Sequence, residues 1–207
     1  MLNTLSRSIN VRLIAITGGI GCGKSVVARM VQVMGYNVYD CDSRAKALMT
    51  TNPEVRKQLL MAFGDETYLN DGTLNRQHLS QVAFADANKL SLLNGIVHPA
   101  TSRDMRQWAD EQAQKGFSLA FVETALLRTA GLERMVDGVW HVSAPTTVRI
   151  DRVMKRNGLT AQQVRDRIDA QFIENQLVEG EQPIINDNKT ALLPQVLQLL
   201  NKHEYQQ

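Results

Sequence analysis

The stretch VRLIAITGGIGCGKS, from Val11 to Ser25, decides the fold. Its first part is a short apolar run, which is typical of a strand buried on both faces of a parallel sheet. Its second part, Gly18 to Ser25, matches G-x-x-x-x-G-K-[ST], in which a glycine-rich turn connects a strand to a helix. In that arrangement, backbone N–H groups and the positive end of the helix dipole converge on a phosphate group. The stretch therefore predicts a phosphate-binding loop, or P-loop.

The residue types of this loop each suit a polyphosphate. The glycines let the backbone adopt positive φ and approach anionic oxygens closely, whereas a Cβ would clash. Lys24 can reach the β and γ phosphates, and the Ser25 hydroxyl can bind Mg²⁺. We therefore expect ATP and Mg²⁺ as cofactors. The expected nucleotide-binding residues are Gly18, Gly21, Cys22, Gly23, Lys24, Ser25 and Val26.

The sequence on either side of the loop extends the pattern. Apolar residues recur at helical spacing from Val27 to Met34, and Gly35 stands where a C-terminal cap belongs. Val38 and Tyr39 then lead into Asp40 as a second strand, which a right-handed crossover makes parallel to the first.

The remaining chain alternates helices with strands. We expect helices over about 43–115, with His98 and Pro99 at a junction between two of them, and further strands at 119–122, 139–142 and Ile184–Ile185. A helical hairpin is expected over about 145–175, with Gly158 ending its first helix and Thr160 and Gln163 forming a capping box for the second. The predicted class is α/β, a P-loop NTPase-type parallel sheet of about five strands with helices on both faces. One domain over 11–207 is expected, with its core at 11–42, 117–142 and 184–207, and with 1–10 as a leader.

Carboxylates stand at the ends of two predicted strands. Open α/β sheets bind ligands beyond the carboxyl ends of their strands. In this sequence, the residues at those ends are Asp40, Asp42 and Glu123. Asp40 is the candidate to orient an acceptor hydroxyl and receive its proton, while Asp42 fits the role of helix N-cap better. Glu123 suits an acid near Mg²⁺, and a cap or salt-bridge role is an equal alternative.

Arginines follow the fourth strand at helical spacing. Arg149, Arg152 and Arg156 share one helix face. This face is either simply solvated or part of a lid that closes over the triphosphate, offsets its negative charge and excludes water. In the lid interpretation, Arg149 and Arg156 are catalytic candidates, together with Lys24 of the loop.

Composition excludes several classes of function. Lys and Arg number 23 and Asp and Glu 21, so the net charge of +2 is too small to suggest nucleic acid as a partner. No apolar run is long enough for a bilayer, two cysteines form no disulfide framework, and the four histidines lack zinc-ligand spacing. We expect a cytoplasmic protein with free thiols, small-molecule substrates and no obligate protein partner.

The order of motifs resembles the bacterial dephospho-coenzyme A kinase family over about residues 11 to 200. The similar segments are ITGGIGCGKS, VYDCD followed by Lys46, FG at Phe63, DGTLNR ending in Arg76, HP at His98, RIDRVMKR and IIND. The resemblance implies transfer of the γ-phosphoryl group of ATP to the ribose 3′-hydroxyl of dephospho-coenzyme A. It assigns Asp40 to that hydroxyl, makes 43–115 a helical substrate-binding insert with Lys46, Arg76 and His98 near the acceptor, and makes the hairpin a lid.

The chain departs from the family pattern at four positions. Ala125 and Thr129 replace a usual proline and glutamate, Glu181 stands where aspartate is common, and Asn188 stands where glycine is common.

Two alternatives remain from the residues alone. Another small-molecule P-loop kinase, acting on a nucleoside, nucleotide or sugar, would share loop, acid and lid. A nucleotide-dependent switch is disfavoured because Asn188 and Lys189 are not followed by the residues of a guanine-reading N-K-x-D motif.

Overall fold

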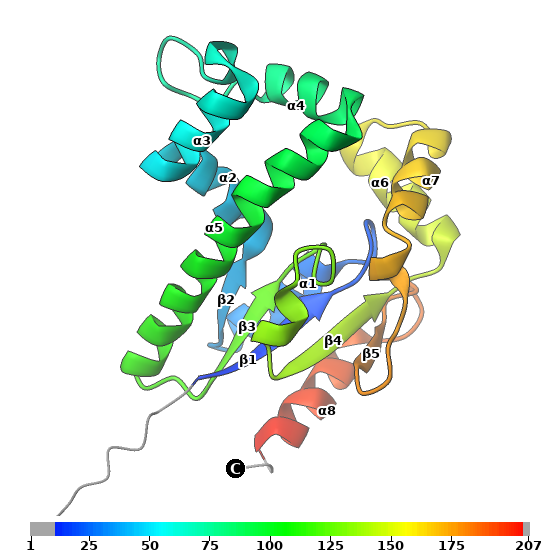
Figure 1. Cartoon of the computed structure of the whole chain (residues 1–207). Coiled ribbons are helices and arrows are strands. Elements are labelled where there is room, and N and C mark those ends of the chain that lie inside the picture. The colour runs from blue at the N-terminus through cyan, green and yellow to red at the C-terminus, as the bar shows by residue number, and fades with distance from the viewer. Residues whose placement is uncertain (1–10, 205–207) are drawn as a thin grey trace, which may run out of the picture. The chain divides into compact units, whose positions relative to one another are not determined.

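The computed structural model describes residues 11–204, which form two compact units (Figure 1). One unit combines residues 11–39 with 109–204, and the other is the continuous segment Asp40–Trp108. The expected leader, 1–10, lies outside the described residues. Within 11–204, no helix is both long and apolar enough to cross a membrane.

The first unit is built on a five-stranded sheet in the order β2-β3-β1-β4-β5. β1 pairs in parallel with β3 and β4, and β4 pairs in parallel with β5, which confirms the predicted parallel sheet. The chain leaves β1 toward β2 on one side and reaches β4 on the other, so the loop after β1 lies where the connections reverse. Open α/β sheets bind ligands at this point. The strands are β1 (Arg12–Thr17), β2 (Asn37–Asp40), β3 (Leu119–Glu123), β4 (Gly138–Ser143) and β5 (Gln182–Ile185).

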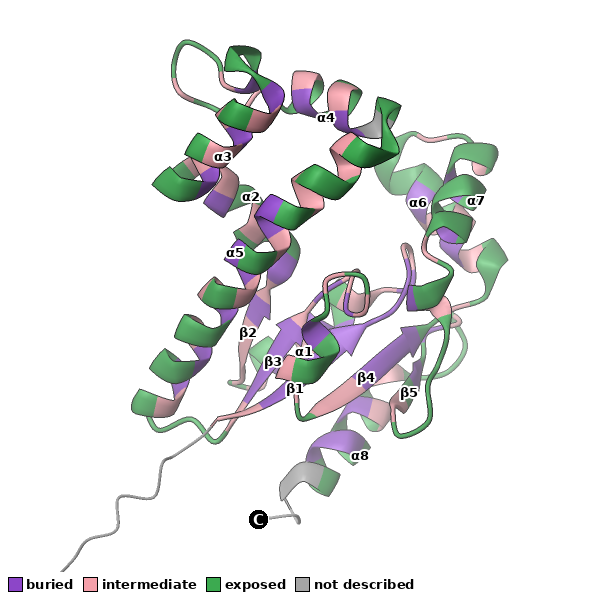
Figure 2. Cartoon of the chain, in the orientation of Figure 1, coloured by how far each residue is buried: buried purple, intermediate pink, exposed green. Residues whose placement is uncertain are grey.

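Helices α1 (Lys24–Val33) and α8 (Leu192–Glu204) pack together and against the strands of the sheet. The central strands are almost wholly buried, as Figure 2 shows, because their apolar side chains fill both faces. The rings of Phe121 and Trp140 lie 4.9 Å apart in this core, and Tyr36 meets Phe121 edge-on at 5.5 Å. This core fixes the direction in which β1 delivers the glycine loop.

The end of α1 is a hydrogen-bonded C-cap. Gly35 has φ of 95°, its N–H donates to Gln32 O at 3.0 Å, and the N–H of Tyr36 donates to Val31 O at 3.0 Å. These two bonds form a Schellman motif and confirm Gly35 as the residue that ends the helix.

The expected hairpin consists of α6 (Thr146–Asn157) and α7 (Ala161–Ala170), followed by the 3₁₀ turn η3 (Ile173–Asn175). Gly158 caps α6 in the left-handed region, and Thr160 and Gln163 form the predicted capping box. Val153, Val164 and Ile168 make a small core inside the hairpin.

The second unit is helical. Its elements are α2 (Cys41–Thr51), α3 (Pro53–Phe63), the 3₁₀ turn η1 (Asp65–Thr67), α4 (Arg76–Ala85) and most of α5 (Ala87–Gln114). Asn52 caps α3 through the N–H groups of Glu54 and Val55, with Pro53 at the first helical position, as the sequence predicts.

Two local predictions in this region are wrong. His98 and Pro99 mark no junction, because α5 continues through Pro99. An interior proline costs about 3 kcal/mol, and burial of Ile96, Val97 and Ala100 around it offsets that cost. The N-cap of α2 is Asp40 rather than Asp42, since the Asp40 carboxylate accepts the Ser43 N–H at 3.0 Å and the Ser43 hydroxyl at 2.5 Å.

The outer strand β5 has its backbone bonded to one side chain. Gln195 of α8 accepts the N–H of Ile185 at 2.8 Å and donates to the C=O of Ile185 at 2.9 Å. The amide therefore stands in for a neighbouring strand at the end of β5.

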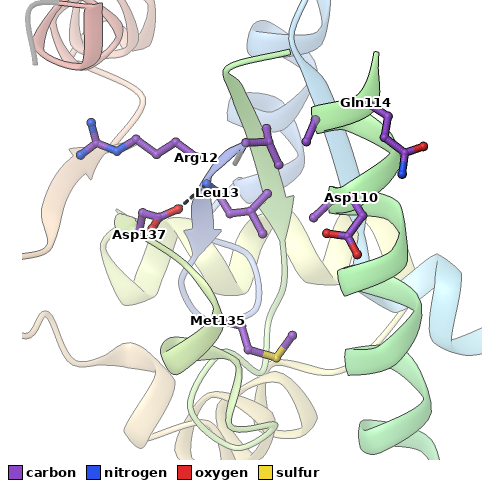
Figure 3. Close-up of a pocket in the computed structure, with 9 residues that line it drawn as sticks. Arg12, Leu13, Asp110, Gln114, Met135 and Asp137 are labelled. Carbon is purple, nitrogen blue, oxygen red and sulfur yellow. Dashed lines mark hydrogen bonds between the residues drawn. The ribbon is translucent and has the colours of Figure 1, made fainter. Parts of the chain in front are cut away.

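An open hollow of about 790 Å³ lies at the amino end of β1 (Figure 3). Asp137 accepts the N–H of Leu13 there at 2.7 Å, and Asp110 and Gln114 of α5 line another side. The glycine loop follows the opposite, carboxyl end of β1, so this hollow is not the phosphate site.

Candidate active site

The glycine loop has the backbone that its sequence predicts. Gly18, Gly21 and Gly23 have φ of 137°, 80° and 93°, values that residues with a Cβ rarely adopt. Gly18 also has no room for a side chain, because a Cβ there would lie 2.1 Å from the carbonyl oxygen of Val142. The turn is therefore fixed by close packing against β4 as well as by its own dihedral angles.

Helix α1 begins in a form that suits an anion. Gly23 is its N-cap and offers no side-chain hydrogen bond, and its first turn contains no acidic residue. The N–H groups of a helix start need acceptors, and phosphate oxygens are suitable ones. Ser25 and Val26 lie in this first turn, and Lys24 Nζ reaches back over the loop to Gly19 O at 3.3 Å.

Two arginines of α6 hold the carbonyl side of the loop. Arg149 Nε donates to Ile20 O at 2.8 Å, and Arg152 Nη1 donates to Gly21 O at 3.3 Å. Asn186, which follows β5, donates to Cys22 O at 2.8 Å and accepts Arg152 Nη2 at 3.0 Å. These bonds turn the loop carbonyls toward cationic and amide donors, and they bring positive charge to the expected polyphosphate site.

The arginine stripe is thus divided. Arg149 is only 6% exposed and Arg152 is half-buried, so a purely solvated face is wrong for both. Arg156 is exposed near the end of α6 and donates to Asn157 Oδ1 at 2.9 Å. Its predicted catalytic role stays a prediction.

Side chains from the end of the hairpin complete the enclosure of the loop. Gln171 Oε1 accepts the N–H of Ile20 at 2.7 Å, and Asn175 Oδ1 accepts Arg149 Nη2 at 2.9 Å. Gly19 leaves the space for both, since a Cβ there would lie 1.9 Å from Asn175 Oδ1 and 2.3 Å from Arg149 Nη2. The second glycine of the loop is therefore required by close approach.

We expect Gly19→Ala to force Arg149 and Asn175 apart and to destabilise the protein by about 1–3 kcal/mol, with weaker ATP binding. Denaturant unfolding and calorimetric titration with ATP measure the two effects. Gly95→Ala is the matched control, because Gly95 is exposed in α5 and an added Cβ would meet nothing within 4 Å, so alanine there should stabilise the helix by about 0.5–1 kcal/mol. Wild-type unfolding and ATP affinity in Gly19→Ala would contradict the steric argument.

The two predicted acids lie at strand ends. Glu123 ends β3 and stands opposite Ile16 in the parallel register, which brings it to the edge from which the loop leaves β1. Asp40 ends β2, and its capping bonds to Ser43 orient its carboxylate. A carboxylate at Glu123 and a hydroxyl at Ser25 are hard oxygen ligands, so the residues present fit Mg²⁺.

A buried charge cluster connects η3 to the turn after β3. Glu174 is 1% exposed and accepts the N–H groups of Arg128 and Thr129 at 3.1 and 2.8 Å. Arg128 also pairs with Glu181, whose other carboxylate oxygen lies 3.3 Å from His141 Nδ1. Burial lowers the pKa of His141, and the neighbouring Glu181 carboxylate partly opposes this effect.

Two of the four departures from the family pattern, Glu181 and Asn188, have a structural explanation. Glu181 forms an ion pair with Arg128, which lies between the departures Ala125 and Thr129. Asn188 has φ of 67°, and it is the single positive-φ residue other than glycine among those described. Asparagine tolerates this region better than other side chains, which explains how it replaces glycine.

The predicted acceptor residues belong to the second unit. Lys46 lies on α2, Arg76 is the first residue of α4, and His98 lies in the middle of α5. Burial lowers the pKa of His98, so its ring is neutral at neutral pH and can donate or accept a hydrogen bond.

Sequence reasoning missed Gln171, Asn175, Glu174 and Asn186. Each acts on residues between 26 and 164 positions away in the chain, which no local pattern reveals. Two signals were available: the doubled glycine GGI, where Gly19 lies outside the positions that the motif requires, and the segment IIND, which contains Asn186.

A parallel sheet with this loop at its switch point, an uncapped helix start and arginines around the loop defines a P-loop kinase. The sequence model of dephospho-CoA kinase matches residues 12–192. Dephospho-CoA kinases from Porphyromonas gingivalis and Bacteroides fragilis are 38% and 36% identical over 189 and 188 residues, which is 90% of this chain and 92% and 90% of theirs. The chain belongs to the dephospho-CoA kinase family.

Two solved structures are similar to this chain in fold. TT1252 from Thermus thermophilus is similar with a TM-score of 0.76 and 29% identity, over 95% of this chain and 98% of that chain. A dephospho-CoA kinase from Campylobacter jejuni, 20% identical, shares the fold with a TM-score of 0.68 over 92% of this chain and 96% of that chain.

Proposed function

We propose that this chain transfers the γ-phosphoryl group of ATP to the ribose 3′-hydroxyl of dephospho-CoA, giving CoA and ADP, the final step of CoA biosynthesis. The observation that carries the proposal is the loop Gly18–Ser25, whose glycine backbone, uncapped helix start and flanking guanidinium groups suit a triphosphate. Family membership supports dephospho-CoA as the acceptor.

The loop and Lys24 would hold the β and γ phosphates. Ser25, and Glu123 through water, would hold Mg²⁺, which would neutralise negative charge on the triphosphate. Arg149 adds its charge beside the loop, and Arg156 would approach from the exposed end of α6. Positive charge at these points stabilises the transition state of phosphoryl transfer more than it stabilises the ground state.

Asp40 would align the 3′-hydroxyl with the γ phosphorus. The new bond forms between the 3′-oxygen and phosphorus, the bond to the β-phosphate oxygen breaks, and the hydroxyl proton passes to the Asp40 carboxylate. Phosphoryl transfer has a loose transition state, so positioning by Asp40 matters more than its basicity. Lys46, Arg76 and His98 would bind the acceptor.

The test offers the purified full chain ATP, Mg²⁺ and a panel of acceptors: dephospho-CoA, adenosine, nucleoside monophosphates and simple sugars. The expected product is a 3′-phosphomonoester on dephospho-CoA alone, identified by ³¹P NMR and mass spectrometry. Transfer to another panel member, with none to dephospho-CoA, would establish the alternative of a different small-molecule kinase. Omission of Mg²⁺ or addition of EDTA should abolish transfer.

We further propose that the protein acts in the cytoplasm on small molecules without an obligate partner.

A further inference from the structure

Ile20, in the middle of the phosphate loop, is held at both backbone groups by side chains from other elements. Gln171 Oε1 accepts its N–H at 2.7 Å, and Arg149 Nε donates to its C=O at 2.8 Å. Its side chain packs against the core of the α6–α7 hairpin, formed by Val153, Val164 and Ile168. The loop residue is therefore fixed in position and in the orientation of its peptide groups.

The segment that carries Gln171 is itself anchored. Asn175 Nδ2 donates to Ile168 O at 2.8 Å, and Asn175 Oδ1 holds Arg149. Glu174, buried between these contacts and the turn after β3, accepts the N–H groups of Arg128 and Thr129. Gln171 thus bonds the phosphate loop to a segment that is tied to both the hairpin and the sheet.

Ordering a glycine-rich loop costs conformational entropy, which is greatest for glycine. A loop that is ordered before binding does not lose that entropy again when the nucleotide arrives. The hydrogen bond from the Ile20 N–H to Gln171 helps to order the loop before nucleotide binds. Because the Gln171 side chain is neutral, it has no charge with which to attract a phosphate.

We propose that Gln171 is a positioning residue, which acts through Ile20 to pre-order the phosphate loop for nucleotide. This rests on the nucleotide site of the proposed function. It predicts that removal of the Gln171 acceptor weakens ATP binding, while bound ATP restores the loop and leaves turnover nearly intact.

Gln171→Met tests the proposal, because methionine keeps the length of the side chain and lacks the amide acceptor. We expect the Kd for ATP and the KM for ATP to rise about 5- to 50-fold, the range expected when a partly buried N–H loses its acceptor. We expect kcat at saturating ATP and the KM for dephospho-CoA to stay within about twofold. Amide hydrogen exchange across residues 18–26 should accelerate in the nucleotide-free variant and return to the wild-type rate with saturating ATP.

Gln162→Met is the matched control on the same hairpin, since the Gln162 side chain is exposed and its amide bonds to Asp166. It should leave ATP affinity and loop exchange unchanged. Gln171→Glu, which restores an acceptor oxygen, should recover slow exchange in the loop. A Gln171→Met protein that has a lower Tm but wild-type ATP affinity and loop exchange would show a merely structural residue and overturn the proposal.

An error in the proposed function can be distinguished from an error in the proposed role of Gln171. If the wild-type protein binds ATP but phosphorylates a different alcohol, the acceptor assignment is wrong and the Gln171 comparison still stands. If the wild-type protein does not bind ATP, the function is wrong, and unchanged loop exchange in nucleotide-free Gln171→Met would separately overturn the positioning role.

Discussion

Lys24→Ala is expected to lower kcat by about a hundred- to a thousand-fold, the usual cost of removing one preorganised charge from a transition state. Lys24 is the first residue of α1, whose start has no side-chain cap, and its ammonium group donates to Gly19 O in the loop, where the β and γ phosphates would bind. Alanine suits the first turn of a helix, so the fold should be retained. Steady-state kinetics and calorimetric ATP binding, with thermal unfolding as a check, measure the effect.

The control for this variant is Lys57→Ala, which removes one positive charge from an exposed position on α3. It should keep kcat and ATP affinity within about twofold of wild type. Unchanged turnover and affinity in Lys24→Ala would remove the loop lysine from the mechanism.

Asp40→Asn is expected to lower kcat by about 10²- to 10⁴-fold. Its one amide oxygen would stay on the Ser43 N–H, so the acceptor hydroxyl would meet an NH₂ group in place of the carboxylate oxygen that aligns it and takes its proton. The design separates catalysis from folding, because asparagine is as good an N-cap as aspartate and can still accept the Ser43 N–H. Asp40→Asn should therefore unfold nearly as wild type does. Asp40→Ala should lose activity and, in addition, about 0.5–2 kcal/mol of stability through loss of the cap.

Asp42→Asn is the matched control two residues along. Asp42 is exposed in the first turn of α2 and is not its cap, so its loss should cost at most about 0.3–1 kcal/mol of helix-dipole stabilisation and little activity. If Asp40→Asn turns over dephospho-CoA normally, Asp40 is a cap alone, and another group must orient the acceptor hydroxyl.

The parts of the fold that the sequence predicts are those set by neighbouring residues. The strand, loop and helix at Val11–Met34, the ending at Gly35 and the capping box at Thr160 depend on dihedral preferences and hydrogen bonds within a few positions. Their signals are present in the sequence because the interactions themselves are local.

The errors and omissions have the opposite origin. Pro99 suggests a helix end, yet packing of α5 against residues far along the chain overrides that local preference. The sequence favours Asp42 over Asp40 as the cap of α2, yet β2 ends at Asp40 and the helix begins at Cys41, which makes Asp40 the cap. Arg149 was found by helical spacing, whereas its contact with Ile20 spans 129 positions and follows from the sheet topology.

The amide of Gln195 has a consequence for the protein in a crowded cell. β5 is the edge strand of its sheet, and Ile185 in it is an apolar residue that is 46% exposed. An edge strand of this kind can pair with a strand of another molecule unless its backbone groups are already bonded. With the N–H and C=O of Ile185 already satisfied by Gln195, a second molecule cannot extend the sheet at that residue without first displacing the amide. Helix α8 thereby protects the edge strand β5 against edge-to-edge aggregation.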